Sequence, residues 1–186
     1  NITDIDDKII QKSQEKKVNY RELGESVWKE FTLAHEDLNC LVPDIEPRAT
    51  AYIPQIIKYI DQLIKNGFGY ITTSGVYYDV SRFKNYLDLS GRSIDEVRTG
   101  TRVETEEDKK RAEDFALWKF PKKGEPPWAS PWGEGRPGWH IECSTMISET
   151  LGKTIDFHCG GIDLIFPHHE NELAQSRGLN INENFV

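Results

Sequence analysis

The sequence has few cysteines, no long apolar run and no excess of basic residues. Its three cysteines, Cys40, Cys143 and Cys159, are an odd and sparse set among 186 residues, and no Cys-x-x-Cys pair occurs. Such a set is not typical of a disulfide framework or of a structural zinc module closed by paired cysteines. We therefore expect each cysteine to be an unbridged thiol or a metal ligand.

The absence of a long apolar stretch also restricts where the protein acts. No run approaches the roughly 20 residues that cross a bilayer. The first residues, NITDIDDKII, have neither the basic head nor the apolar core of a signal peptide. The formal charge of -8 disfavours broad binding of a phosphate backbone, because such binders cluster positive charge. These features predict a cytoplasmic protein without membrane contact, and any nucleic-acid contact should be local or supplied by residues elsewhere.

The length and the 37% hydrophobic content suit one domain, or one domain with an insertion. The clearest helix runs from Pro47 to Asn66, where apolar residues repeat at i, i+3, i+4 and i+7. Pro54 should bend or start this helix rather than lie in its middle, and Gly67 should end it. Asp4, Asp6 and Asp7 are expected at the start of an earlier helix, where carboxylates cap backbone N–H groups.

The other expected elements alternate between helices and short strands. The polar segment 81–114 has no sustained period and is interpreted as an insertion rather than core. The Pro- and Trp-rich segment 121–138 is interpreted as a loop that packs back on its own domain. The patterns predict a helix over 20–39, a hairpin around Ser74-Gly75, a strand at 115–118, a helix over 139–151, a strand over 154–158 and a helix over 167–177.

The segment 156–176, DFHCGGIDLIFPHHENELAQS, carries the strongest chemical signal. His168 and Glu172 are four residues apart, so on a helix they share one face with Cβ atoms roughly 5–6 Å apart. With Cys143, in GWHIEC, they make a thiolate, imidazole and carboxylate set that suits zinc and leaves a fourth position open. The acid could ligate directly or orient the imidazole from outside.

Each of these residues also has a structural interpretation. Cys143 shares a helical face with Trp139, which is compatible with a small core residue. His168 and Glu172 could form a hydrogen-bonded pair, and Gly160-Gly161 an ordinary tight turn. The order of strand, glycine turn and helix favours an α/β nucleotide-binding sheet.

Four longer motifs resemble the cysteinyl-tRNA synthetase family. They are NITDIDDKII at the start, EPRAT at 46–50, SPWGEGRPGWHIECSTM at 130–146 and FPHHENELAQS at 166–176, and the resemblance runs from end to end. This family belongs to the class I aminoacyl-tRNA synthetases. The resemblance implies an α/β, Rossmann-like catalytic domain, present in part as 1–66 and 135–186, with a connective insertion at 67–134.

The resemblance also implies an activity and a metal. The family activates cysteine with ATP and Mg²⁺ to cysteinyl-adenylate and transfers it to tRNA(Cys). A zinc ion held by two Cys, one His and one Glu selects the substrate thiolate. By motif match Cys143, His168 and Glu172 are three of its ligands, and the other Cys is expected before Asn1. The HIGH and KMSKS signatures are expected before Asn1 and after Val186, so the isolated chain should be inactive.

Substrate-binding residues follow from the same match. Thr3 in NITD and Trp139 in GWHIEC correspond to residues that line the cysteine pocket. His158, Gly161 and Asp163 correspond to the segment against the adenosine, with Asp163 as the ribose contact. No catalytic side chain is assigned within these residues.

One departure from the family pattern falls in the nucleotide segment. The family shows Gly-Gly-Gly-Ser-Asp where this chain has Cys159, Gly160, Gly161, Ile162 and Asp163. The first glycine and the serine are therefore replaced, and Cys159 would be an additional thiol near the nucleotide.

Two alternatives remain at this point. One is the related ligase that joins cysteine to an amino sugar in mycothiol synthesis, against which Glu172 argues because the string after His-His-Glu diverges there. The other is a zinc-stapled binding module without chemistry, against which the lack of paired cysteines argues. We expect the protein to be a monomer.

Overall fold

A computed structural model describes residues 1–100 and 108–179 of the chain. The chain divides into two units, Asn1–Tyr52 and Ile53–Val186. None of the helices in the described part has the length and apolar character that crossing a bilayer needs. The helices are α1 (Asp7–Lys16), α2 (Tyr20–Asp37), α3 (Ile53–Lys65), α4 (Ile94–Gly100), α5 (Trp139–Thr150) and α6 (Glu170–Leu179), and the strands are β1 (Gly69–Ile71), β2 (Gly75–Tyr78), β3 (Phe115–Lys119) and β4 (Arg136–Pro137).

The first unit contains two helices that pack against each other, α1 and α2. α1 begins where predicted, because the Asp6 carboxylate accepts a hydrogen bond from the Ile9 backbone N–H at 2.7 Å. α2 begins after Asn19, whose side chain caps the N–H of Arg21 at 2.9 Å. No residue of α2 is buried, but its side chains contact the rest of the first unit: the Trp28 indole N–H donates to the Glu46 carboxylate at 2.9 Å, and Glu25 pairs with Arg48 at 2.8 Å.

The residues before α1 pair with the segment that precedes α3. Ile2 forms a single parallel bridge with Arg48. Asp4 does not cap α1, because its carboxylate accepts from the N–H and the hydroxyl of Thr50 at 2.9 and 2.5 Å. Thr3, which the sequence assigned to the cysteine pocket, is half-buried between these two contacts.

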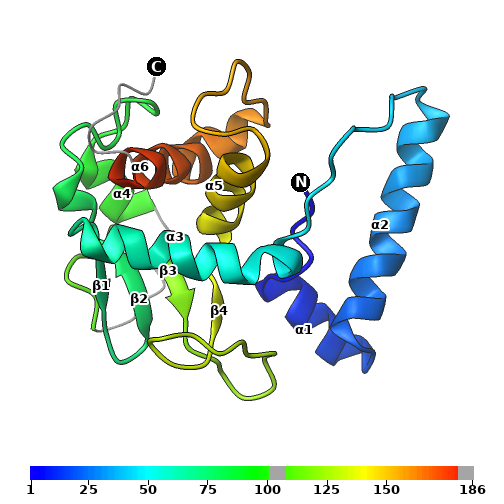
Figure 1. Ribbon diagram of the computed structural model, residues 1–186, viewed down its shortest axis with the longest axis horizontal. Helices are drawn as coiled ribbons and strands as arrows, with labels where there is room; N and C mark the ends of the chain where they lie inside the picture. The colour runs from blue at the N-terminus through cyan, green and yellow to red at the C-terminus, as the bar shows by residue number, and fades with distance from the viewer. Residues whose placement is uncertain (101–107, 180–186) are drawn as a thin grey trace. The chain divides into compact units, whose positions relative to one another are not determined.

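The second unit places three helices against a small sheet, as Figure 1 shows for α3, α5 and α6. Ile56, Ile60 and Leu63 form the buried face of α3 and are 0% exposed. Pro54 lies in the first turn, as predicted, because a proline there loses no helical hydrogen bond. Gly67 follows the helix with φ +81°, a conformation that favours glycine.

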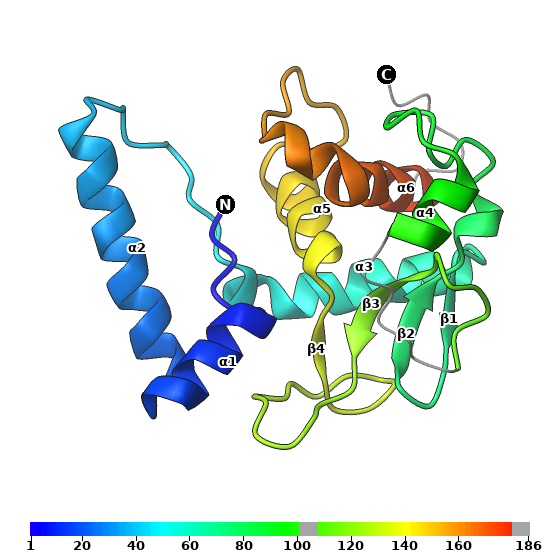
Figure 2. The ribbon, with the colours of Figure 1, turned by 180° about the vertical axis from the view of Figure 1, so that it is seen from behind.

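The sheet is antiparallel and runs β1-β2-β3-β4 in chain order (Figure 2). The predicted hairpin is confirmed: Tyr70 pairs with Tyr77, and Ser74 lies in the turn. The predicted strand at 115–118 is confirmed as β3, with Trp118 opposite Val76. Helices and sheet together give the mixed α/β composition expected, although the sheet of the described residues is antiparallel rather than parallel.

The Pro- and Trp-rich loop packs back onto the sheet, as predicted. Trp118 of β3 is fully buried. The Trp132 ring meets it edge to face, with ring centroids 6.2 Å apart. Trp128 pairs with Gly135 across the loop through backbone hydrogen bonds of 2.7 and 2.9 Å. The two loop tryptophans are therefore half-buried against their own domain rather than fully presented to another protein.

Two expectations were wrong. The segment 154–158 forms no strand: Phe157 is 87% exposed, and no neighbouring strand in the described residues pairs with it. Apolar residues alone do not make a strand, because its N–H and C=O groups need a partner. The segment 81–114 contributes to the core despite its polar composition, because Leu87 and Val97 are 7% and 2% exposed.

Gly138 allows the chain to pass close to β3 before α5 begins. Its N–H donates to the Leu117 carbonyl at 2.9 Å, and a Cβ atom there would overlap the Ala116 carbonyl oxygen. We expect Gly138→Ala to destabilise the protein by about 2–3 kcal/mol, measured by thermal or chemical denaturation. Gly24→Ala, on the open face of α2, should be neutral or stabilise by about 0.5–1 kcal/mol. Equal stability of Gly138→Ala and wild type would contradict this packing.

Candidate metal centre

A thiol, an imidazole and a carboxylate converge between α5 and α6. The ligand atoms of Cys143, His168 and Glu172 all lie within 4.8 Å of one another, and all three residues are buried. Cys143 forms no disulfide. One thiol, one imidazole and one carboxylate are a donor set that zinc accepts.

The pair predicted from helical spacing is in contact. His168 lies in the distorted helical turn Ile165–His169, directly before α6, and Glu172 lies in the first turn of α6. The His168 Nε2 atom is 3.2 Å from Glu172 Oε1. Residues four apart meet on one helical face, which is why the sequence was sufficient to predict this contact.

The other nitrogen of His168 is occupied by a second histidine. The Nδ1 atoms of His140 and His168 share a hydrogen bond of 3.0 Å. Burial, and then the neighbouring His168 charge, lower the pKa of His140 to about 3, so His140 is neutral near pH 7. This bond fixes the His168 ring with Nε2 toward Glu172, as an outer partner does for a metal-bound histidine.

Trp139 closes one side of this pair. Its ring centroid lies 4.3 Å from that of His168 and 5.1 Å from that of His140, and the residue is 44% exposed. Trp139 therefore borders both solvent and the buried imidazole.

The Glu172 carboxylate faces a third histidine through its other oxygen. His158 Nε2 lies 2.9 Å from Oε2, and this contact raises the pKa of His158. Burial acts to raise the pKa of Glu172, but the contacts with His158 and His168 outweigh it and lower the pKa to about 2. Glu172 is therefore a carboxylate at neutral pH.

These contacts are short but poorly aligned. Among the residues that the structure describes, no well-aligned hydrogen bond reaches either Glu172 oxygen, and both oxygens are buried. A buried carboxylate in this state is costly unless a cation or proton donor satisfies it. The centre thus fits a metal ion on the evidence of its own polar atoms.

Glu172 also belongs to a second group, with His158 and His169. The ligand atoms of these three lie within 4.8 Å of one another, although His158 is exposed and His169 half-buried. The two imidazoles meet edge to face at 4.9 Å. Gly160 allows the approach, because a Cβ atom there would lie 2.6 Å from His169 Nε2. The first group is the more enclosed and alone contains a thiol.

A pocket of about 280 Å³ opens beside the second group. It is bounded by His158, His169 and Glu172 on one side and by apolar residues such as Ile147 and Leu173 on the other. The pocket gives a small molecule direct access to the Glu172 side of the centre.

The other predicted binding residues lie at the surface or in the first unit. Gly161 and Asp163 are exposed, and the Leu164 N–H donates to the Gly161 carbonyl at 2.9 Å. Thr3 belongs to the first unit. His158, predicted to face the nucleotide, contacts Glu172 instead, while its ring remains partly accessible.

His140 was not among the site residues predicted from the sequence. A signal was present, because His140 precedes Cys143 by three residues and so shares its helical face in GWHIEC. The contact with His168, however, joins residues 28 apart. Spacing within one helix does not predict such a contact.

Comparison with known proteins assigns the chain to a class. The family of tRNA synthetases class I (C) catalytic domains matches residues 1–186, and the chain belongs to this family.

Several similar curated proteins are cysteine–tRNA ligases. The chain is 53% identical to the cysteine–tRNA ligase of Methanococcus maripaludis over 176 residues, and 55% identical to that of Pyrococcus abyssi over 179 residues. It is 54% identical to the cysteine–tRNA ligase of Coxiella burnetii over 180 residues. Each match covers 95% of this chain but only 37 to 39% of the relative.

Proposed function

We propose that this chain is part of an enzyme that activates cysteine with ATP and Mg²⁺ and transfers it to tRNA(Cys). The observation that carries the proposal is the buried convergence of Cys143, His168 and Glu172 in a chain more than half identical to cysteine–tRNA ligases. Neither part would suffice alone, because similar donor sets occur on many folds.

We infer that Cys143, His168 and Glu172 hold zinc. The thiol and imidazole favour zinc over Mg²⁺ or Ca²⁺, which prefer oxygen ligands. The two buried Glu172 oxygens without an aligned hydrogen bond support a cation at this position. His140 would keep the His168 ring in the ligating orientation through the 3.0 Å bond between their Nδ1 atoms.

The metal would supply selectivity for a thiol. Cysteine and serine differ by one atom, and pocket shape alone separates such near-isosteres by about 1–3 kcal/mol. Bound zinc favours a thiolate, because a thiol has a pKa near 8.5 while a hydroxyl stays protonated. Selection at the binding step would then need no separate editing.

The remaining residues would bind the substrates. Trp139 would line the cysteine pocket next to His168. The motif match alone supports Thr3 as a second residue that binds cysteine. Asp163 and Gly161 are accessible for a nucleotide, with the Asp163 carboxylate as acceptor for ribose hydroxyls. His158 would be near both the nucleotide segment and Glu172.

The test is ATP–pyrophosphate exchange by the full-length protein with cysteine and with serine. We expect cysteine to be preferred by at least about 10³-fold with zinc, since shape alone would give at most roughly 200-fold. Removing zinc should abolish the exchange with cysteine. Activity that survives zinc removal with unchanged selectivity would contradict the proposal.

A second arm of the experiment replaces the acceptor. The full-length protein should charge tRNA(Cys) with cysteine and should not join cysteine to the amino sugar of mycothiol synthesis. Product formation with the amino sugar alone would assign the chain to the related ligase instead.

A further inference from the structure

A buried carboxylate holds the loop of residues 86–91 against the start of α6. Glu170 is 0% exposed. Its Oε1 atom accepts from the Leu87 backbone N–H at 2.9 Å, and its Oε2 atom from the Ser90 N–H at 2.8 Å. Both oxygens of one carboxylate are therefore used on a single loop that lies 80 to 83 residues earlier in the chain.

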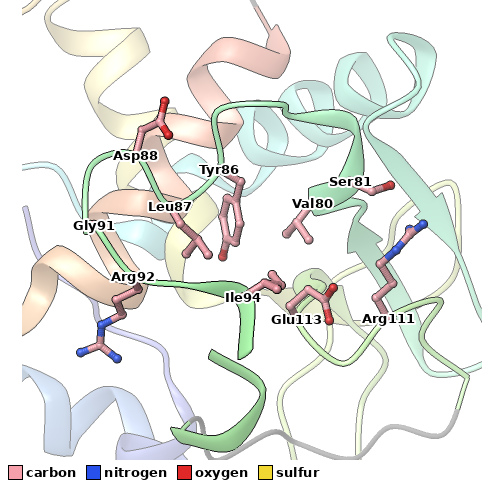
Figure 3. Close-up of a pocket in the computed structure, with 10 residues that line it drawn as sticks. All are labelled: Val80, Ser81, Tyr86, Leu87, Asp88, Gly91, Arg92, Ile94, Arg111 and Glu113. Atoms are coloured by element: carbon pink, nitrogen blue, oxygen red, sulfur yellow. The ribbon is translucent and has the colours of Figure 1, made fainter. Parts of the chain in front are cut away.

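Two further contacts join the same segments. The Tyr86 hydroxyl donates to Asn171 Oδ1 at 2.7 Å. The Arg92 guanidinium lies 4.8 Å from the centroid of the Phe166 ring, within cation–π range. Figure 3 shows Tyr86 directed from the loop toward a pocket of about 620 Å³, which it lines together with Leu87.

The loop has a conformation that requires such support. Leu87 has φ +81°, which is unfavourable for a residue with a side chain, and yet it is only 7% exposed. The Gly91 N–H closes the turn onto the Leu87 carbonyl at 2.8 Å. A carboxylate that accepts two backbone N–H groups stabilises this turn more than a neutral acceptor would.

The same carboxylate lies between two residues of the candidate metal centre. Glu170 follows His168 by two residues and precedes Glu172 by two. The loop reaches the centre as well, because Leu89 lines the pocket beside Glu172 and His158. Displacing the loop would therefore act on the turn that orients both His168 and Glu172.

We propose that Glu170 is a positioning residue that clamps the 86–91 loop onto α6 and thereby sets the metal affinity of the centre. Glu170 touches neither the metal-binding atoms nor the substrate pocket. The inference rests on the metal binding proposed above, and it predicts that a segment remote from the ligands in sequence controls their geometry.

The test is Glu170→Gln in the full-length protein. Glutamine keeps the shape but presents an NH₂ donor to one of the two backbone N–H donors. We expect the Leu87 and Ser90 amides to exchange hydrogen at least about tenfold faster, and the zinc dissociation constant to rise about 10- to 100-fold in a chelator competition, the range for losing an outer partner. Cobalt substitution should show a changed absorption spectrum.

Asp88→Asn is the matched control. Asp88 is an exposed acid in the same loop, and its carboxylate accepts a local hydrogen bond from the Asn85 side chain at 2.6 Å. Its zinc affinity and amide exchange should stay within about twofold of wild type, the spread expected of surface changes. Tyr86→Phe removes the hydrogen bond to Asn171. It should raise the zinc dissociation constant and the amide exchange rate by about threefold, in the same direction as Glu170→Gln. This variant replaces Glu170→Gln in the test if Glu170→Gln is too unstable to purify.

The outcomes separate the inference from the proposed function. One outcome is that wild type binds zinc through Cys143 and Glu170→Gln binds zinc with unchanged affinity. This outcome would refute the positioning role of Glu170 and leave the proposed function intact. If the wild-type protein binds no zinc, or binds zinc that Cys143→Ser does not weaken, both the positioning role and the proposed function would be refuted. Weaker zinc binding in Glu170→Gln and Tyr86→Phe, but not in Asp88→Asn, supports the clamp.

Discussion

Cys143→Ser is expected to weaken zinc binding by at least about 100-fold, and His168→Ala by a similar factor. Losing an outer partner of a metal site already costs about 10- to 100-fold, and a direct ligand contributes more. Serine has nearly the shape of cysteine but remains protonated and ligates poorly. The measurement is the metal content of the purified full-length protein after dialysis, followed by chelator competition.

Two variants make this experiment specific. Cys159→Ser makes the same chemical change at an exposed thiol and should keep full zinc. His169→Ala removes a histidine of the second group, which shares Glu172 with the first. Zinc retained in Cys143→Ser but lost in His169→Ala would show that the ion lies on the side of His158 and His169, and the ligand assignment would be wrong.

A protein made of these 186 residues alone is expected to form cysteinyl-adenylate at least about 10³-fold more slowly than the full-length enzyme. Class I catalysis depends on positioning and charge stabilisation, and removing even one donor of this kind costs about 10²–10³ in rate. The resemblance assigns the ATP-phosphate contacts to the HIGH and KMSKS signatures, and neither string occurs in this sequence. Weak binding of zinc and cysteine should remain.

The comparison is adenylate formation by the two proteins at equal concentration. A correctly folded 186-residue protein is required, so circular dichroism and metal content serve as controls. Rates within about tenfold, a difference of only 1.4 kcal/mol in the barrier, would show that the catalytic groups lie within these residues.

Features that depend on neighbouring residues were predicted well from the sequence. The Asp6 cap, the buried face of α3 and the Ser74-Gly75 hairpin all follow from periods and caps within about a dozen residues. The contact of His168 with Glu172 belongs to the same kind, because one helical turn separates them. Local geometry requires such contacts wherever the helix forms.

Elements that depend on a distant partner were predicted less well. The segment 154–158 was expected as a strand and is not one, because no described strand lies beside it. The polar segment 81–114 was expected outside the core, but Leu87 is buried against a turn held by Glu170. Composition describes a segment alone, whereas burial depends on what packs against it.

Motifs such as FPHHENELAQS were sufficient to identify the family, and residue types showed which side chains could bind a metal. How these groups meet depends on the fold. Packing of α5 against α6 brings Cys143 and His140 to His168, and the fold brings Glu170 to Leu87 and Ser90. These contacts join residues 25 to 83 positions apart in the sequence. Hydrophobic periodicity does not predict which residues meet at such separations, because the contacts are set by the free energy of packing.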